Sequence, residues 1–346
     1  MADSTVTTPP RRRPGAPTLE EVAELAGVSR STASRAINGG LRVSPEAQAS
    51  VEAAIAQLGF TPNRAARSLV TRRSDSVALV VPEPDERVLT DPFFAGTLNG
   101  LSAALSATEL QLVLLIVRPG DNARATRYLR NGHVDGAIVV SHHQDDSLDR
   151  ALADSRLPHV FVGRPLEGDR DVRHVDLDNR LGGRIATDHL VRLGRRRIAT
   201  LAGPQDMAAG LDRLAGWREA LREVGLPDDA VVTGDFTVAG GAAAAAELLD
   251  RHPDIDALFA ASDLMAVGAL GVLAERGLAV PDDVAVVGYD DLGVAESTKP
   301  PLTTVTNPVV AMARRAGEML VDQLAGATVP TEPVIFAPEL VVRQSA

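Results

Sequence analysis

Residues 18–40 read TLEEVAELAGVSRSTASRAINGG and hold two short helical patterns. Thr18 is a good N-cap for the first pattern, and the glutamates that follow it complement the positive end of a helix. Gly27 predicts the end of this helix, because glycine adopts positive φ there at little cost. Ser29 then caps a second helix over residues 30–37, which an Asn-Gly-Gly stretch ends. Two helices joined by this short turn predict an all-α helix-turn-helix domain.

A third helix is predicted over residues 45–58, with Ser44 as its cap. In a helix-turn-helix the second helix lies in the major groove of DNA, where arginine grips guanine bidentately and serine reads bases less sharply. We therefore expect four residues of that helix at base edges, namely Arg30, Ser31, Ser34 and Arg35. Phosphate contacts are expected from Thr18, Ser29, Thr32 and Asn38. The alternative is an ordinary helical hairpin whose polar face is solvated.

Charge is distributed unevenly along the 346 residues. Residues 1–73 contain ten arginines and six acidic residues, a balance of +4, which leaves −15 for the rest of a chain of net charge −11. A basic head on an acidic body directs the head toward phosphate and keeps the body away from it. The distribution favours DNA binding by the head, although small basic segments are common in other proteins.

The composition argues against several other classes of protein. The chain has no cysteine, so it has neither a disulfide framework nor a thiolate metal site or nucleophile. Residues 1–17 are rich in proline and arginine and lack the apolar stretch of a secretory signal, so we expect a disordered arm. No run approaches the roughly 18 apolar residues of a membrane span. We expect a cytoplasmic protein without membrane contact.

Beyond the head, apolar runs of strand length alternate with helical patterns. Seven runs read as buried parallel strands: SVALVV (76–81), LVLLIV (112–117), GAIVV (136–140), HVFV (159–162), RIATLA (197–202), ALFAA (257–261) and VAVVG (284–288). Helical stretches lie between them, for example residues 151–157, 180–193, 211–224 and 265–276. Repeated strand–helix units predict a doubly wound α/β fold that binds ligands at the carboxyl ends of its strands.

Motifs for catalysis are weak in this body. The sequence contains no GxGxxG, Walker or GxSxG pattern, so we expect no catalytic residue and no cofactor. The pairs His142-His143 and Asp145-Asp146 could suggest a metal site, but adjacent side chains point apart and the spacing matches no ligand pattern. We favour the alternative, a polar loop after a strand, and predict no metal.

Taken together, these motifs resemble the LacI/GalR family of bacterial repressors. The similarity continues through RRRIATLAGP, RLAGWREAL, AASDLMAVGAL, VPDDVAVVGYDD and PPLTTV, so it covers residues 18 to about 343. Ala33 departs from the usual valine, and Ala47-Gln48 departs from Thr-Arg, which puts one phosphate contact in doubt. The resemblance implies an effector-binding body of two α/β lobes, like periplasmic sugar-binding proteins, in a homodimer that binds a palindromic operator.

This resemblance divides the chain into four parts. They are an arm (1–17), a helix-turn-helix domain (18–60), a hinge helix with its linker (61–74) and an effector-binding and dimerisation domain (75–343). We expect the body to exchange between its lobes near residues 164 and 291. One lobe then consists of residues 75–164 with 292–322, and the other of residues 165–291 with 323–343.

The hinge matches Pro62–Leu69, which on sequence alone is a short amphipathic helix. In the family this helix folds when two protomers meet on the operator. By the same resemblance Asn63 and Ala66 contact DNA, and Leu69 wedges between base pairs in the minor groove. Such a wedge unstacks a base step and is compensated by added contact on the kinked DNA.

Several residues of the body match effector positions of the family. The resemblance places the DPFF segment with Phe93 and Phe94 at the effector, with the alternative that one of the two rings packs its own helix instead. Arg213 matches an arginine that hydrogen-bonds effector hydroxyls or carboxylates, with a surface arginine as the alternative. Asp290 matches an aspartate that accepts bonds from the ligand. Asp263 follows another strand end and is either an effector residue or an N-cap.

Local runs also resemble the actinobacterial repressors of cellulose-utilisation genes that respond to cellobiose. These runs are SLVTRRSDSVALVV, VGRPL, RRIATLAGPQDM, GDFT and AASDLM. The resemblance to that group implies that Arg164 and Asp206 face the sugar. Met207 stands where the purine-responsive branch of the family has an arginine, which disfavours a purine effector. Trp217 is expected to be structural.

Asp176 and Asp178 alternate along HVDLDN, an extended segment before a helix. They could pass for a carboxylate pair, but in the family this segment marks a structural turn. The residues that remain suit a sugar, because carboxylates, arginine and an aromatic surface match vicinal hydroxyls that donate and accept together.

The sequence thus predicts a sequence-specific DNA-binding transcriptional repressor of carbohydrate-utilisation genes. Its expected partners are double-stranded operator DNA and a small-molecule effector. The best expectation for the effector is cellobiose or a short cello-oligosaccharide, acting as an inducer. When bound to its operator, the protein is expected to lie on the nucleoid. The alternatives keep the architecture but use a corepressor, activate transcription, or respond to a different sugar or a non-sugar effector. No heptad tail follows ELVVRQ, so we expect a homodimer rather than a tetramer.

Overall fold

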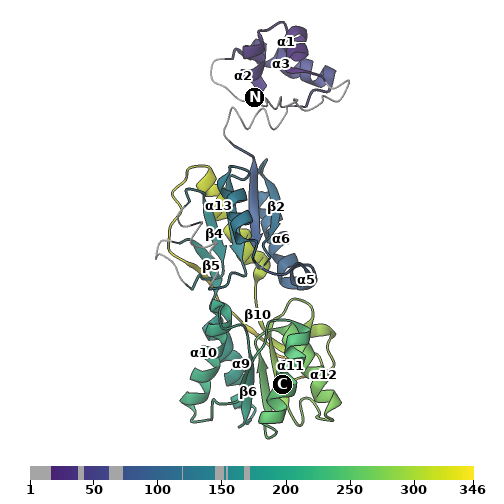
Figure 1. The fold of residues 1–346 in the computed structure, drawn as a ribbon, viewed down its shortest axis with the longest axis vertical. Coiled ribbons are helices and arrows are strands. Elements are labelled where there is room, and N and C mark those ends of the chain that lie inside the picture. The colour runs from purple at the N-terminus through teal and green to yellow at the C-terminus, as the bar shows by residue number, and fades with distance from the viewer. Residues whose placement is uncertain are drawn as a thin grey trace, which may run out of the picture. The chain divides into compact units, whose positions relative to one another are not determined.

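The computed structural model describes residues 17–37, 43–61, 73–118, 120–144, 152, 155–166 and 172–346. It divides into two compact units, a head (Met1–Ser74) and a body (Asp75–Ala346) (Figure 1). Several predictions fall outside the described residues and stay predictions. They concern the arm, the hinge helix with Asn63, Ala66 and Leu69, and the positions of Asn38, Asp145 and Asp146.

The described residues of the head form three helices, α1 (Leu19–Leu25), α2 (Arg30–Ile37) and α3 (Pro45–Leu58). Thr18 begins α1 with a capping box: its hydroxyl accepts from Glu21 N, and its own N–H donates to the Glu21 carboxylate at 2.7 Å. Gly27 makes the turn at φ 68°, a conformation that a side chain would strain. Val22, Ala33 and Val51 come one from each helix into a small buried core. The predicted helix-turn-helix is therefore present.

The body consists of two α/β lobes, which we call lobe 1 and lobe 2 (Figure 1). The sheet of lobe 1 has the strand order β11-β5-β4-β3-β1-β2, and its pairs are parallel. Its strands are β1 (Ser76–Val81), β2 (Gln111–Ile116), β3 (Gly136–Val140), β4 (His159–Val162), β5 (His174–Leu177) and β11 (Val334–Phe336). Its helices are α5 (Asp85–Thr90), α6 (Pro92–Leu105), α7 (Asn122–Arg130) and α13 (Val309–Leu324).

Helices α6 and α13 pack so closely that glycine is required between them. A Cβ atom at Gly100 would lie 2.3 Å from the carbonyl oxygen of Val310, a backbone atom that cannot move aside. This contact joins the last helix of the body to its first long one, so residues far apart in the sequence share one lobe.

The sheet of lobe 2 has the order β12-β10-β9-β8-β6-β7, parallel except for the antiparallel pair of β12 and β10. Its strands are β6 (Ile198–Ala202), β7 (Val231–Thr233), β8 (Ala257–Ala260), β9 (Ala285–Asp290), β10 (Thr303–Thr306) and β12 (Leu340–Val341). Its helices are α9 (Asn179–Arg192), α10 (Ala208–Glu223), α11 (Val238–Arg251), α12 (Asp263–Glu275) and the short η1 (Ala295–Ser297). Within the described ranges, every helix is too short or too polar to cross a membrane.

The exchange points predicted near residues 164 and 291 are wrong. The chain passes to lobe 2 only after β5, returns to lobe 1 after β10, and crosses again between β11 and β12. The cause is backbone pairing: β5 hydrogen-bonds with β4, and β10 with β9, so each strand stays in its partner's lobe. A helix was also predicted over residues 151–157. Its last three residues, 155–157, are described and are not helical.

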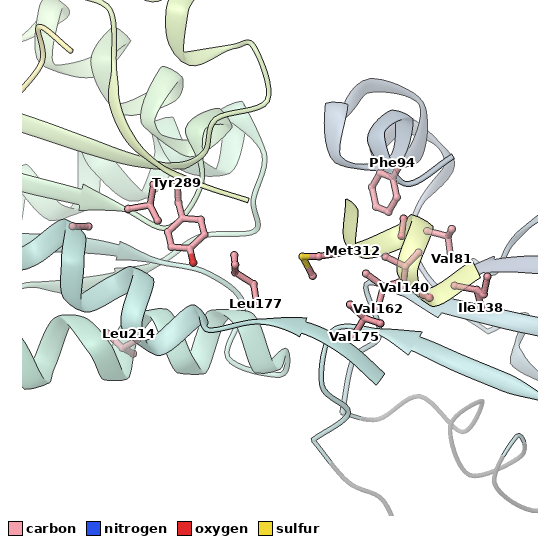
Figure 2. Packing of buried hydrophobic residues seen from close by; sticks show 14 of the residues in the cluster. Val81, Phe94, Ile138, Val140, Val162, Val175, Leu177, Leu214, Tyr289 and Met312 are labelled. Atoms are coloured by element: carbon pink, nitrogen blue, oxygen red, sulfur yellow. The ribbon is translucent and has the colours of Figure 1, made fainter. Parts of the chain in front are cut away.

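The hydrophobic core of the body extends through both lobes. Figure 2 shows Phe94 and the valines of the lobe 1 strands on one side, and Leu214 and Tyr289 of lobe 2 on the other. Leu177, at the end of β5, and Met312, in the first turns of α13, lie between these two groups. The strands that carry the core therefore end where the two lobes meet.

Candidate functional site

The exposed face of α2 carries the residues predicted to contact DNA. Arg30 is 70% exposed in its side chain, and its Nε lies 2.7 Å from the Glu20 carboxylate of α1. Arg35 donates from Nε to the Ser31 carbonyl oxygen at 3.2 Å, along the same helix. The exposed pair of Arg30 and Glu20 contributes little to stability, so Arg30 can exchange Glu20 for a base or a phosphate at little cost.

The cap of α2 gathers the hydroxyls that were predicted to contact phosphate. Ser29 Oγ accepts from Thr32 N at 3.1 Å and lies 2.8 Å from the Thr32 hydroxyl and 2.9 Å from that of Ser31. Ser34 is half-buried on the same helix. The structure thus places Ser29, Arg30, Ser31, Thr32, Ser34 and Arg35 on α2 and its cap, whereas Thr18 caps α1 and Asn38 is not described.

A cavity between the two lobes brings together the ends of several strands, and we call it the inner cavity. Both lobes supply charged residues to it. Its lining includes Arg87, Asp91, Phe93, Ser141, His142, Arg164, Asp176, Asn179, Met207, Arg213, Phe236, Asp290 and Asn307. These positions lie at the carboxyl ends of parallel strands, in the loops that follow, or in the first turns of the next helices, where the fold class predicts a ligand.

Arg213 and Asp290, two of the predicted effector residues, face each other in this cavity. Arg213 is 5% exposed, so it is not the surface arginine of the alternative. Its Nε donates to Asn179 Oδ1 at 2.9 Å, and its Nη1 donates to the Ala261 carbonyl oxygen at 2.6 Å. The same Nη1 lies 3.5 Å from Asp290 Oδ1. The guanidinium carbon lies 3.6 Å above the centre of the Tyr289 ring, which holds it flat.

Burial governs the protonation of Asp290. It raises the pKa of this carboxyl to about 6, although the charge of Arg213 and a hydrogen bond from Asn307 Nδ2 at 3.1 Å both lower it. Asp290 also adopts φ 117°, an unusual conformation for a residue other than glycine. The carboxylate is thus held in the cavity against both solvation and backbone preference.

The two phenylalanines have different positions. Phe93 is half-buried and lines the inner cavity. Phe94 is 1% exposed, packs in the hydrophobic core, and meets Phe93 edge to face at 5.3 Å between ring centres. Phe94 thus takes the alternative expected for one of the two rings and packs in lobe 1, whereas Phe93 is the ring that lines the inner cavity.

Arg164 lines the inner cavity, and Asp263 does not. Arg164 comes from the loop after β4 and bonds to Asp212 of α10 at 2.7 Å, which links the two lobes. Asp263 is 3% exposed and accepts from the Thr304 hydroxyl at 2.6 Å and from Asp291 N at 2.8 Å. The N-cap role predicted as the alternative for Asp263 is wrong, because Ser262 is the N-cap of α12 and Asp263 braces the loop after β9.

Asp206 lies outside the inner cavity. It faces a neighbouring groove, where its Oδ2 lies 2.8 Å from His143 Nδ1. The other ring nitrogen of His143 lies 3.2 Å from Glu83 Oε1. The hydrogen bond with Glu83, followed by that with Asp206, raises the pKa of His143 to about 9, so the imidazolium bridges lobe 1 and lobe 2.

His142 lines the inner cavity, although the sequence predicted only a polar loop at this position. It is 6% exposed, and within the described part of the chain neither ring nitrogen has a well-formed hydrogen bond. Burial lowers the pKa of His142 to about 4 and outweighs a weak interaction with the Arg164 backbone, so the ring is neutral. A neutral imidazole can donate from one nitrogen and accept at the other. Among the described residues no group of His, Asp or Glu is arranged to hold a metal ion.

Asp176 is a second cavity residue that the sequence did not identify, because in HVDLDN a structural turn was favoured over a carboxylate pair. Asp178 does cap α9 by accepting from Leu181 N at 2.9 Å. Asp176 instead lines the inner cavity, and burial raises its pKa to about 6. Its Oδ1 accepts from Asn179 Nδ2 at 3.3 Å, and Asn179 in turn accepts from Arg213. Alternation along a strand would place residues two apart on the same face, and the two side chains separate here because β5 ends at Leu177 and Asp178 turns to cap α9. As predicted, Trp217 is structural, since it is fully buried in the core.

Charge is balanced across the described lining of the inner cavity. It contains three arginines and three aspartates, namely Arg87, Arg164, Arg213, Asp91, Asp176 and Asp290, together with the neutral His142. A balanced set of donors and acceptors suits an uncharged polar ligand, because an anionic or cationic ligand would leave a buried charge without a partner.

Comparison with known proteins agrees with these two parts of the chain. Residues 18–63 match the family described as bacterial regulatory proteins, lacI family, and residues 187–346 match the periplasmic binding protein-like domain. The HTH-type transcriptional regulator CelR of Thermobifida fusca is 51% identical over 341 residues, which are 97% of this chain and 99% of that protein. The chain belongs to the lacI family. It is therefore a DNA-binding transcriptional regulator, as predicted.

Other members of the lacI family are similar along nearly the whole chain. The ribose operon repressor of Escherichia coli K12 is 34% identical over 336 residues, 95% of this chain and 99% of that protein. A solved transcriptional regulator CelR–cellobiose complex matches with a TM-score of 0.77 and 48% identity, covering 95% of this chain and 100% of that one. A lac repressor dimer bound to operator and the anti-inducer ONPF matches with a TM-score of 0.81 and 27% identity, covering 95% and 99%. These matches confirm the predicted fold class.

Proposed function

We propose that this protein represses carbohydrate-utilisation genes and leaves its operator when cellobiose or a short cello-oligosaccharide binds. The observation that carries the proposal is the inner cavity with its balanced charge, in a chain that resembles the CelR–cellobiose complex. Sugar hydroxyls donate and accept together, which matches carboxylates and guanidinium groups set side by side. Phe93 supplies an apolar surface for the face of a sugar ring.

Binding between the lobes gives the sugar a means to act on the DNA-binding head. A ligand that touches Phe93 and Arg164 of lobe 1 as well as Arg213 and Asp290 of lobe 2 favours one arrangement of the two lobes. In a homodimer such a change alters how the two hinge segments meet on a palindromic operator. Sugar and operator then weaken each other's binding by the same factor, as linkage requires.

The proposed contacts with DNA follow from α2 and its cap. Arg30, Ser31, Ser34 and Arg35 read bases, while Thr18, Ser29, Thr32 and Asn38 hold phosphates. Asn63, Ala66 and the wedge residue Leu69 complete the contact from the hinge. We propose a cytoplasmic protein that lies on the nucleoid when operator-bound, and one that needs no catalytic step for this cycle.

An electrophoretic mobility assay tests the proposal. The DNA is the region upstream of the protein's own gene, and the challenge is a panel of cellobiose, cellotetraose, maltose, ribose and glucose. Release by the cello-oligosaccharides alone is the expected result. If every sugar leaves the DNA complex intact, the proposed inducer is wrong, and tighter binding with cellobiose would instead indicate a corepressor.

Two measurements exclude indirect effects. The Arg213→Met variant should still bind the DNA without sugar but fail to release it, because the substitution lies in the body and removes a group of the inner cavity. Sugar affinity should also fall in the presence of operator. An identical sugar affinity with and without operator would refute the coupling between the two sites.

A further inference from the structure

A second depression lies at the boundary between the lobes, beside the inner cavity, and we call it the outer groove. Lobe 1 contributes the stretch from Pro82 to Pro84, Val117, Asn122 and His143, and lobe 2 contributes residues 204–206 and 233–235. The outer groove encloses about 630 Å³, whereas the inner cavity encloses about 100 Å³. Apart from Arg87, which also lines the inner cavity, and Asp206, for which a sugar contact is predicted, the larger of the two spaces is lined by residues outside the effector site described so far.

The two spaces are neighbours, because the same loops line both. Arg87 lines the inner cavity and the outer groove alike. Three loops also place one residue on each side, in the adjacent pairs His142 and His143, Met207 and Asp206, and Phe236 and Asp235. Arg87 and Phe236 form the partition between them, with the guanidinium carbon 5.5 Å from the centre of the ring.

We propose that the outer groove is a second saccharide subsite, so that a linear sugar chain places one end in the inner cavity and further units in the groove. The inference rests on the proposed function and extends it to chain length. Small-molecule sites usually enclose about 300–1,000 Å³, so the inner cavity alone is too small for an oligosaccharide and the outer groove supplies the missing volume.

The lining of the outer groove suits uncharged hydroxyls. The Asn122 side chain has no hydrogen bond to any other described residue, so both its donors and its acceptor are available. Gln205 uses Nε2 to bond the Gly203 carbonyl oxygen at 2.7 Å, which leaves its side-chain oxygen able to accept. The Asp206 side chain is 53% exposed and accepts from His143 with one oxygen. The buried Nε of Arg87 lies 4.0 Å from Asp91 Oδ2 and has no hydrogen-bond partner among the described residues.

The groove also lies where the two lobes are tied together. His143 of lobe 1 bonds Asp206 of lobe 2, and Gln144 N donates to the Asp206 carbonyl oxygen at 2.8 Å. A sugar unit in the groove would touch residues on both sides of this bridge. Occupation of the outer groove is thus expected to favour the same lobe arrangement as occupation of the inner cavity.

Titration calorimetry of the full-length protein with cellobiose, cellotriose and cellotetraose tests the inference. We expect wild-type affinity for cellotetraose to exceed that for cellobiose by about tenfold. Thr233→Trp fills the groove from an exposed position at the end of β7 and should reduce the tetraose-to-biose ratio to near one. Thr328→Trp makes the same change at an exposed residue outside both spaces and should leave the ratio unchanged.

Asn122→Ala gives a second, non-steric variant in case the tryptophan disturbs folding. It should lower cellotetraose affinity several-fold and leave cellobiose affinity within about twofold. A wild-type ratio near one, or a high ratio that survives both groove variants, would overturn the second subsite while leaving the proposed function intact. If wild-type protein binds none of these sugars, the proposed function fails and the subsite with it.

Discussion

Replacing Arg213 with methionine is expected to destabilise the body, because the arginine is the buried partner of several groups. It makes hydrogen bonds at 2.9 Å and 2.6 Å and lies 3.5 Å from Asp290, and its side chain is only 6% exposed. Removing one partner of a buried charge pair typically costs about 3–5 kcal/mol. Protonation limits the cost here. Burial already raises the pKa of Asp290 to about 6, so losing the arginine has to raise this pKa by little more than one unit before the carboxyl takes up a proton at pH 7. Each unit of that rise corresponds to about 1.4 kcal/mol. We therefore expect a loss of about 3 kcal/mol at pH 7.

A double-mutant cycle separates the pair from the rest of the arginine's contacts. In the Asp290→Asn background no carboxylate remains to be stranded, so Arg213→Met should cost about 1–2 kcal/mol less than in wild type. Urea unfolding followed by fluorescence measures both values, since Trp217 is the single tryptophan and is fully buried in the body. The control is Arg222→Met on the same helix, where an exposed pair with Asp228 is worth under about 1 kcal/mol. Strictly additive effects of the two substitutions would refute this account of Asp290.

Three further predictions concern the boundary between the lobes. Because burial raises the pKa values of Asp176 and Asp290 to about 6, cello-oligosaccharide affinity should decline from pH 7 to pH 5, and a flat calorimetric profile would contradict this. Over the same range these carboxyls bind protons more readily in the folded than in the unfolded chain, so their contribution to the free energy of unfolding increases as the pH falls. His142→Leu should weaken sugar binding about tenfold and His142→Asn much less; equal affinities would show that the ring makes no bond to the ligand. The pKa of His143 is raised to about 9, so its stabilising contribution is present in full below about pH 6.5 and lost as the pH rises through 9. Thermal unfolding from pH 6 to pH 10 should show this loss in wild type and not in His143→Gln.

The head could be predicted from the sequence in detail because its signals are local. Thr18, Ser29 and Ser44 each accept a hydrogen bond from a backbone N–H three residues later, as their residue types indicated. Gly27 and Gly59 adopt the positive φ values of 68° and 62° that end their helices. None of these features depends on residues far away in the chain.

The body was predictable where the strands are long and apolar, and not where pairing decides. Strands such as β1 and β3 are buried over nearly their whole length, so a continuous apolar run identified them. By contrast β5, β10 and β11 have four residues or fewer, and β5 and β10 include polar ones. Only their hydrogen bonds with neighbouring strands define them, and they decide in which lobe each crossing of the chain falls.

The inner cavity was predictable in part, for the same reason. Arg213 and Asp290 follow from the family resemblance, and the structure brings them together. Phe94 and Asp263 are sequence neighbours of cavity-lining residues, but their own side chains are buried away from the cavity. The position of a residue near a strand end does not tell which of two neighbouring side chains faces the cavity. His142 acquires its role from burial on the lobe boundary, a property that its sequence neighbours do not show.

Backbone strain links the cavity to the loops that also line the outer groove. Of the five non-glycine residues with positive φ in the described chain, three line the inner cavity: Ser141 at 56°, Phe236 at 64° and Asp290 at 117°. Such conformations cost about 1–3 kcal/mol each and persist only where the surroundings impose them. Ser141 immediately precedes the pair His142 and His143, and Phe236 belongs to the pair Asp235 and Phe236. The strained backbone at these two positions therefore fixes which side chain of each pair faces which space. Glycine at Ser141 would relieve the strain, but it would also remove the hydrogen bond that the Ser141 hydroxyl donates to Glu83 at 2.6 Å and free the loop. We therefore expect Ser141→Gly to weaken the response to sugar without raising stability, as sugar titration and thermal unfolding would measure.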